Sequence, residues 1–290
     1  MLSSSQSTSD VQSPESEKSF ASIDLSNEDD EMVFMKINEI RQWIHSNNKL
    51  CARTDDFTLL KFLRCCNYDV TKTQEKIYNY YAQRTKCPEW FYDRNPFSSE
   101  LEELLDMGVF IPLIQFNDEG RMIIIIRVSI HDPYKHKIAN VIKTGKMILD
   151  VAIKDNMTVS TIGVIVIFDM NNVTLSHGLQ MTPRVVQRLV HSWQGCYPVK
   201  INSLNFINAP LHVNGILTIF KSFMSHKMRT KVNVYSKTSQ NFFSNIPRHL
   251  LPAEYGGSAG NLKTLIDHWK IVVQKNKDWF IEEEKYRVIL

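Results

Sequence analysis

Apolar residues at helical spacing mark the first part of the chain. Between Met32 and Ile44 they recur every three or four residues, which predicts a helix. Leu59–Leu63 indicates a second, short helix. The sequence Thr71-Lys72-Thr73-Gln74 matches a capping box that would open a third helix. Residues 32–95 are therefore predicted to form a small helical unit.

The pattern changes after Gly108, where β-branched and apolar runs replace helical spacing. Val109–Phe116 and Arg121–Val128 are two such runs, and residues 117–120 between them (Asn-Asp-Glu-Gly) have the composition of a turn. This arrangement predicts a β-hairpin. A helical stretch follows at about 138–154.

Farther along, strand and helix patterns alternate. Ile162–Asp169 is a continuous apolar run that suits a strand buried on both faces. The elements expected after it are a helix from Pro183 to Gln194, a strand over Lys200–Asn208, a helix from Pro210 to Met224 and a short strand over Val232–Tyr235. Such alternation is typical of an α/β fold with a mainly parallel sheet and right-handed crossovers.

Charge is distributed unevenly along the chain, although the formal net charge is only +3. Residues 1–31 hold eight acids, one base and ten serines with few apolar residues, so we predict a disordered tail. The rest of the chain carries 33 bases against 23 acids. A basic body of this kind favours an anionic partner, either a membrane surface or a nucleic acid.

The cysteines and the start of the chain indicate the compartment. Five cysteines are present, and no two form a C-x-x-C pair, which argues against a disulfide framework and a zinc site. The start has no secretory signal pattern, and no apolar run approaches the ~20 residues of a spanning helix. We therefore expect a cytoplasmic protein with reduced thiols.

Two motifs raise the question of catalysis or metal binding. Residues 256–260 (Gly-Gly-Ser-Ala-Gly) fit the G-x-S-x-G pattern of a hydrolase nucleophile elbow, with Ser258 as the nucleophile. That elbow works only between a buried strand and a helix, and no strand pattern precedes it. His131 and His136 flank a Pro-Tyr turn, where we expect an ordinary loop. The sequence therefore predicts no catalytic residues and no metal ion.

The expected helix at 210–224 is apolar over most of its circumference. It is either a helix buried in the core or a movable lid that seals an apolar cavity and meets lipid with its outer face. Lys227, Arg229 and Lys231 follow it directly. This basic cluster is either a solvated face or a patch attracted to an anionic membrane, at about 1 kcal/mol per charge.

Several ordered motifs resemble the CRAL-TRIO family. The family's N-terminal helical segment is matched by Asp55-Asp56-x-x-Leu59-Leu60-x-Phe62-Leu63-Arg64. The landmarks of its lipid-binding domain are matched, in chain order, by Ile167-Phe168-Asp169, Ser176-His177, Gln180-Met181-Thr182-Pro183, Tyr197-Pro198-Val199-Lys200, Phe206-Ile207-Asn208-Ala209-Pro210 and Leu251-Pro252-Ala253-Glu254-Tyr255-Gly256-Gly257. The resemblance covers about residues 32–275.

This resemblance implies a non-enzymatic carrier of one small hydrophobic lipid, with no other cofactor. The implied fold is an N-terminal helical unit and an α/β domain with a mainly parallel sheet, an apolar pocket and a lid helix at about 208–231. The implied organisation is a disordered tail (1–31), the helical unit (32–95), the lipid-binding domain (96–275) and a C-terminal extension (276–290).

The resemblance and strand alternation together give candidate pocket residues, each of which also suits plain core packing. They are Ile142, Leu149, Val164, Phe168, Leu179, Leu189, Trp193, Val199, Ile201, Leu204, Val213, Ile216, Leu217 and Phe220. Gly145 and Leu149 stand where tocopherol-binding members carry polar groups. The ligand class implied is tocopherol, a retinoid, a carotenoid or a similar isoprenoid, and a more apolar ligand suits these two positions better.

The family also uses a basic cleft that binds phosphatidylinositol bisphosphate. Lys200, Lys227 and Lys231 hold basic positions of that cleft, and Arg229 is a further candidate. Asn202 and Cys66 stand where the cleft carries arginine. The resemblance therefore implies peripheral membrane association and lipid release at anionic, phosphoinositide-containing membranes.

Two functional hypotheses follow. The first is a monomeric cytoplasmic lipid carrier that releases its ligand at membranes. The second is a phosphoinositide-binding, membrane-recruited adaptor without transfer activity. A nucleic-acid partner is not expected, because the basic cluster adjoins an apolar helix rather than aromatic residues exposed on strands.

Overall fold

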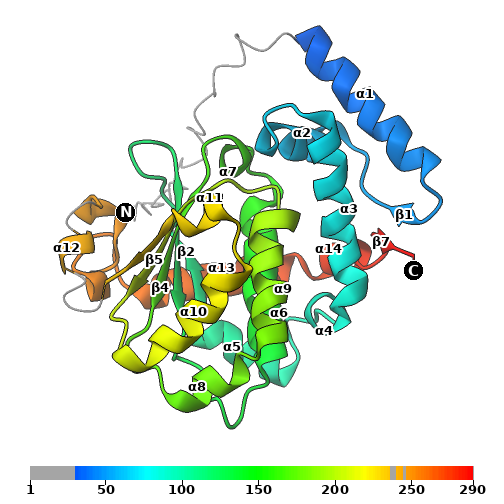
Figure 1. The fold of residues 1–290 in the computed structure, drawn as a ribbon. Helices are drawn as coiled ribbons and strands as arrows, with labels where there is room; N and C mark the ends of the chain where they lie inside the picture. The colour runs from blue at the N-terminus through cyan, green and yellow to red at the C-terminus, as the bar shows by residue number, and fades with distance from the viewer. Residues whose placement is uncertain (1–29, 236–239, 244–245, 290) are drawn as a thin grey trace, which may run out of the picture.

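The computed structural model describes residues 30–235, 240–243 and 246–289, and it confirms the predicted α/β architecture. One five-stranded sheet, flanked by helices, forms the larger part, and a group of helices lies at its side (Figure 1). The acidic tail predicted at 1–31 falls outside the described residues, except that Asp30 and Glu31 begin the first helix. Its disorder therefore stays a prediction.

The N-terminal unit consists of α1 (Asp30–Ser46), β1 (Leu50–Cys51), α2 (Asp56–Cys65), α3 (Val70–Lys86) and α4 (Pro88–Phe91). The start of α3 differs from the predicted capping box at Thr71. The helix begins at Val70, and the Asp69 carboxylate accepts a hydrogen bond of 3.0 Å from the Lys72 amide. An aspartate is as good a cap as threonine, and here it precedes the Thr by two residues.

The sheet contains β2 (Phe110–Pro112), β3 (Met122–Arg127), β4 (Val164–Asp169), β5 (Ile201–Ile207) and β6 (Val232–Val234), in that spatial order. β2 and β3 are antiparallel, and the other neighbours are parallel. The predicted turn is present, because the Gly120 amide donates to the Asn117 carbonyl. However, β2 ends at Pro112, well before the predicted Phe116. The Leu113 amide still donates a hydrogen bond of 2.8 Å to the Ile123 carbonyl oxygen, and the chain leaves the sheet after it.

The remaining helices before the closing segment are α5 (Ser99–Met107), α6 (Ile138–Lys154), α7 (Thr158–Thr161), α8 (Leu175–Gln180), α9 (Pro183–His191), the π-helical turn η2 (Ser192–Cys196), the 3-10 turn η3 (Leu211–Val213), α10 (Asn214–Phe223), α11 (His226–Arg229) and α12 (Gln240–Phe243). Strands β3 to β6 follow chain order across the sheet. The connections between successive parallel strands all cross over with the same hand. They therefore place α6, α9 and α10 on the same face of the sheet, as Figure 1 shows.

The carboxyl ends of β4 and β5 are tied to the segment that precedes the last long helix. The Tyr255 hydroxyl donates a hydrogen bond of 2.8 Å to Asp169 at the end of β4. The Asn208 side-chain amide donates one of 2.9 Å to the same carboxylate. At Gly257 a Cβ would lie 1.8 Å from the Leu251 carbonyl oxygen, so only glycine fits. These motif residues therefore fix the fold around the strand ends.

The last part of the chain returns to the N-terminal unit. It consists of η4 (Arg248–Leu250), η5 (Ala253–Tyr255), α13 (Leu262–Lys275), α14 (Lys277–Glu283) and β7 (Arg287–Val288). β7 pairs antiparallel with β1. Glu283 accepts a hydrogen bond of 2.7 Å from Arg84 and is also paired with Arg53. Burial alone would raise the pKa of Glu283, but these two arginines hold it below its ordinary value.

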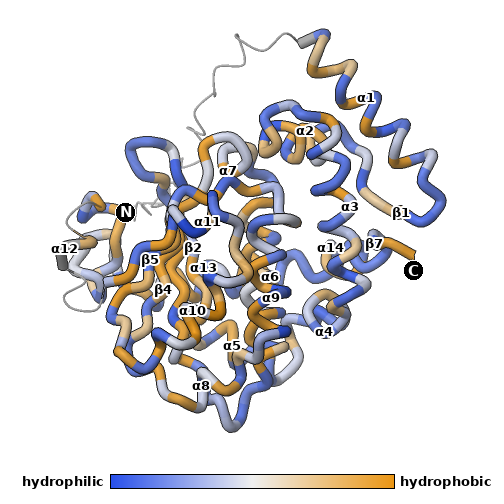
Figure 2. Tube along the Cα trace, in the orientation of Figure 1, coloured by the Kyte–Doolittle hydropathy of each residue, from blue (hydrophilic) through white to orange (hydrophobic). Residues whose placement is uncertain are grey.

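Hydropathy follows this arrangement (Figure 2). Hydrophobic residues concentrate along β4, β5 and the helices beside them, whereas polar residues are frequent in the outer N-terminal unit. Val164, Val166 and Ile167 of β4 are completely buried, as predicted for a strand covered on both faces. Among the described residues, no helix is both long and apolar enough to cross a membrane.

Candidate functional site

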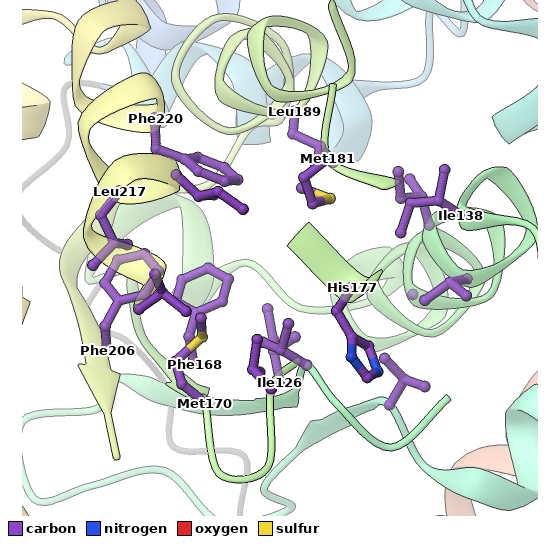
Figure 3. Close-up of a pocket in the computed structure, with 18 of the residues that line it drawn as sticks. Ile126, Ile138, Phe168, Met170, His177, Met181, Leu189, Phe206, Leu217 and Phe220 are labelled. Carbon is purple, nitrogen blue, oxygen red and sulfur yellow. The ribbon is translucent and has the colours of Figure 1, made fainter. Parts of the chain in front are cut away.

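An apolar cavity of about 220 Å³ lies between the sheet and the helices α6, α8, α9 and α10. Ile126, Phe168 and Phe206 occupy one row across β3, β4 and β5, so their side chains share the face that lines the cavity. The rings of Phe168 and Phe206 stack with centroids 4.5 Å apart. Figure 3 shows Leu217 and Phe220 of α10 across from this face.

Helix α10 covers the cavity on one side. Leu217 is its one fully buried residue, while Ile216 and Phe220 line the cavity and are half-buried. Ile216 lies against α8, where a Cβ on Gly178 would come within 2.8 Å of the Ile216 Cδ1 atom. α10 is therefore a covering helix with one inner face, as the lid interpretation requires, and not a core helix buried all around.

The histidines at the cavity wall are bonded within the protein. His131 Nε2 lies 2.9 Å from the Gln180 side-chain oxygen, and His177 Nε2 lies 3.1 Å from the His131 carbonyl oxygen. The two imidazole rings meet edge to face at 5.0 Å. Burial lowers the pKa of His131, which favours its neutral form. These contacts join α8 to the loop after β3.

Ten of the candidate pocket residues lie together around this cavity. They are Ile142, Leu149, Phe168, Leu189, Trp193, Leu204, Val213, Ile216, Leu217 and Phe220. They come from α6, β4, α9, the turn η2, β5 and the segment that contains α10. That these residues contact a ligand stays a prediction.

The other four candidates do not line the cavity. Leu179 is 80% exposed on α8, because the helical turn directs Leu175 and Gly178 toward the cavity instead. Val164 is fully buried at the opposite end of β4 from Phe168, about 13 Å along the strand. The remaining two, Val199 and Ile201, lie at the start of β5 and line a second, polar cleft.

The structure adds lining residues that sequence reasoning missed. Phe110, Ile126 and Val128 come from the hairpin strands and their edges, and Met170 follows β4. The alternation of side chains along residues 121–128 could have identified Ile126, because every second residue of a strand lies on the same face of the sheet. The buried Lys146 also lines the cavity, and an apolar pattern gives no signal for it.

A second hollow is a polar cleft of about 770 Å³. It brings together the candidates Lys200, Lys227 and Lys231 and adds Lys72 and Lys76 from α3, while phosphoinositide binding there stays a prediction. Burial and the neighbouring Lys227 lower the pKa of Lys231. An anion in the cleft would offset this repulsion between lysines.

The fourth basic candidate, Arg229, does not line this cleft. Its guanidinium instead donates a hydrogen bond of 3.0 Å to the Met224 carbonyl oxygen. Asn202 and Cys66 do line the cleft, so they occupy the place expected from the resemblance. Asp69 and Glu75 lie there too, which leaves the cleft with five lysines against two carboxylates and a positive balance.

The cavity and the basic cleft are neighbours. Trp193 of η2 and Met228 of α11 line both of them. Gln194 also connects η2 to the end of α10, because its side chain donates a hydrogen bond to the Phe223 carbonyl oxygen and accepts one from the Ser225 amide. A group bound in the cleft therefore touches the segment that follows α10.

The G-x-S-x-G motif and the histidine loop lack the geometry that catalysis or metal binding would need. Ser258 follows the 3-10 turn η5 rather than a strand, so the strand–turn–helix geometry of a nucleophile elbow is not formed there. His136 accepts a hydrogen bond from the Asp132 amide within its own loop. No group of three or more His, Cys, Asp or Glu residues in the described ranges is arranged to hold a metal ion.

Comparison with known families places the chain. Residues 106–257 match the model of the CRAL/TRIO domain, and residues 29–101 match that of a Pinta-like UBA domain. The first match covers more than half of the chain. The protein therefore belongs to the CRAL/TRIO domain family, whose members bind and transfer lipids.

Individual relatives agree with this assignment. The chain is 28% identical over 234 residues to "Alpha-tocopherol transfer protein-like" of Homo sapiens, covering 81% of this chain and 67% of that protein. It is 22% identical over 249 residues to "Clavesin-2" of Homo sapiens, covering 83% and 76%. The solved structure "Crystal structure of Sfh5" shares the fold, with a TM-score of 0.57 at 12% identity over 88% of this chain and 99% of that chain.

Proposed function

We propose that this protein binds a small hydrophobic lipid in the apolar cavity and transfers it between membranes. The observation that carries the proposal is a cavity that is nearly all apolar and covered by one amphipathic helix, α10. An apolar ligand gains about 25 cal/mol for each Å² of surface that the cavity removes from water. The apolar inner face of a covering helix contacts the ligand in the closed state. When the ligand leaves, the same face can contact membrane lipid instead.

The basic cleft gives the proposed release step. Phosphate groups of an anionic lipid, such as phosphatidylinositol bisphosphate, would pair with Lys200, Lys227 and Lys231. Because Trp193 and Met228 belong to both sites, this pairing would act on the connection at the end of α10. Binding at the membrane and opening of the cavity are thereby coupled.

The ligand class proposed is an isoprenoid-like lipid: tocopherol, a retinoid, a carotenoid or a similar molecule. The resemblance to alpha-tocopherol transfer protein-like proteins supports the class. Gly145 and Leu149 line the cavity and carry no hydrogen-bonding side chain. This part of the wall favours the apolar portion of such a lipid.

Transfer between vesicles tests the proposal. Donor vesicles carry a fluorescent lipophilic probe, and acceptor vesicles contain either neutral phospholipid alone or neutral phospholipid with phosphatidylinositol bisphosphate. We expect the double variant Lys227→Ala with Lys231→Ala to reduce transfer to the anionic acceptors severalfold, more strongly at low salt, and to leave transfer to neutral acceptors nearly unchanged.

The matched control is the double variant Lys49→Ala with Lys285→Ala, which removes the same charge from exposed positions outside the cleft. It should behave like the unaltered protein. Equal losses in both double variants would contradict a role for the cleft. Binding to anionic vesicles without transfer by the unaltered protein would contradict the carrier function and support the adaptor hypothesis.

A further inference from the structure

A lysine lies buried in the wall of the otherwise apolar cavity. Lys146 of α6 is 6% exposed and lines the cavity beside Ser192 and Tyr197. Its ammonium donates a hydrogen bond of 2.6 Å to the Ser192 hydroxyl. That hydroxyl in turn donates one of 2.8 Å to the Gln83 side-chain oxygen. The ammonium is therefore held in a defined position at the cavity wall.

Aromatic rings surround this ammonium on its other sides. Lys146 Nζ lies 5.4 Å from the ring centroid of Trp90, 4.8 Å from that of Phe91 and 4.7 Å from that of Tyr197. Rings at these distances attract a cation, yet they replace only part of the hydration that burial removes. Burial lowers the pKa of Lys146 to about 8, although the nearby Asp150 opposes this shift.

The neighbouring carboxylates are already paired with other groups. Asp150 accepts a hydrogen bond of 2.8 Å from Arg94 and another of 2.8 Å from the Tyr197 hydroxyl. Glu283 is paired with Arg84. Among the described residues, no carboxylate forms an ion pair with Lys146, so this buried cation lacks an anionic partner from the chain itself.

The two thiols near Lys146 do not supply that partner. Burial raises the pKa of Cys196 to about 12 and also raises the pKa of Cys87, so both thiols are neutral at physiological pH. Arg84, the other charged neighbour, carries the same sign as Lys146. An anion that enters the cavity would therefore be the first group of opposite charge to reach this ammonium directly.

We propose that Lys146 is the head-group site of the cavity, and that the preferred ligand is an amphiphilic lipid whose polar end is a carboxylate. This inference rests on the proposed carrier function. The carboxylate pairs with Lys146 beside Ser192, and the apolar part extends along the wall formed by Phe168 and Phe220. A charge-assisted hydrogen bond at a desolvated site is stronger than one between neutral groups, which favours the acid over the matching alcohol.

Two pairs of lipids that differ only at the polar end test this assignment. The probes are retinoic acid with retinol and linoleic acid with linoleyl alcohol. Their affinities for the delipidated full chain are measured by quenching of tryptophan fluorescence, since Trp193 lines the cavity. We expect each acid to bind at least about tenfold more tightly than its alcohol. Equal affinities would overturn the inference.

Substitution then assigns the preference to the residue. Lys146→Met keeps the length of the side chain and removes its charge, so it should abolish the preference for the acid and retain alcohol binding. Lys143→Met is the matched control, because Lys143 is buried on the same helix but does not line the cavity. An acid preference that survives Lys146→Met would also overturn the inference.

The outcomes that would contradict the carrier function differ from those that would contradict the head-group site. If the unaltered chain took up none of the four lipids, the head-group site would be contradicted, whereas the carrier function would be contradicted only if tocopherol and phospholipid were refused as well. Uptake of acids and alcohols with equal affinity would contradict only the head-group site. If Lys146→Met did not fold, as judged by its thermal transition, the comparison of acid with alcohol in the unaltered chain would still decide.

Discussion

At the scale of single residues, part of the family's motifs holds the strand ends together rather than lining the cavity. Asp169, Asn208 and Tyr255 meet in one hydrogen-bonded group at the strand ends, and the Gly257 backbone packs against the Leu251 carbonyl. None of these five residues lines the cavity. These motif residues hold the walls of the site in place, whereas other motif residues, such as Phe168, Tyr197 and Phe206, belong to the lining itself.

Two glycines with opposite surroundings give a prediction at this scale. Gly257→Ala should destabilise the protein by about 3 kcal/mol, because its Cβ would collide with the backbone oxygen of Leu251. Gly215→Ala, in helix α10, has no atom within 4 Å of the new methyl group and should stabilise by up to about 1 kcal/mol. Denaturant unfolding of both variants measures these changes. Equal stability of the two would contradict the close approach at Gly257.

Alternation or helical spacing makes the side on which a residue lies predictable from the sequence. Phe168, Leu204 and Leu217, three of the candidate pocket residues, line the cavity, and their contact with a ligand stays a prediction. The error at Leu179 has a physical reason: α8 is only six residues long, too short for spacing to define its inner face. Lys146 was not predicted, because its neighbours in space, Ser192 and Trp90, are far away in the sequence.

At the scale of elements, α6 and α10 differ in how firmly they are held. α6 has ten buried residues, whereas α10 has one. Local opening is governed by the apolar contacts that an element would lose. α10 is therefore the helix beside the cavity that opens at lower free energy.

Hydrogen exchange measures this difference. In the ligand-free protein, amides of α10 should exchange at least about tenfold faster than those of α6, and bound lipid should slow exchange in α10 more than in α6. Similar protection of both helices, unchanged by ligand, would contradict the assignment of α10 as a movable cover.

The order and type of the elements were largely predictable, because each has a strong periodic pattern. The predicted range 138–154 coincides with α6, and Ile162–Asp169 contains β4. The pairing of β7 with β1 was not predictable. Both strands have only two residues, too few to show alternation, and tertiary contacts such as that between Arg84 and Glu283 bring them together.

At the scale of the whole molecule, the uneven charge of the chain has a structural counterpart. Lysines from α3, the start of β5 and the segment after α10 converge on one cleft, although those of α3 are more than 120 residues away from the others in the sequence. The cleft adjoins the apolar cavity through Trp193 and Met228. The combination of an apolar cavity with a neighbouring basic cleft is the basis for proposing a membrane, rather than a nucleic acid, as the partner.

The central claim is that the protein carries one hydrophobic molecule in its cavity. Native mass spectrometry of the purified protein, combined with organic extraction and identification of the extract, tests it most directly. We expect a complex with one lipid per chain, either as purified or after incubation with lipophilic candidates, and its loss after extraction. A protein that binds no tocopherol, retinoid, fatty acid or phospholipid under these conditions would contradict the account.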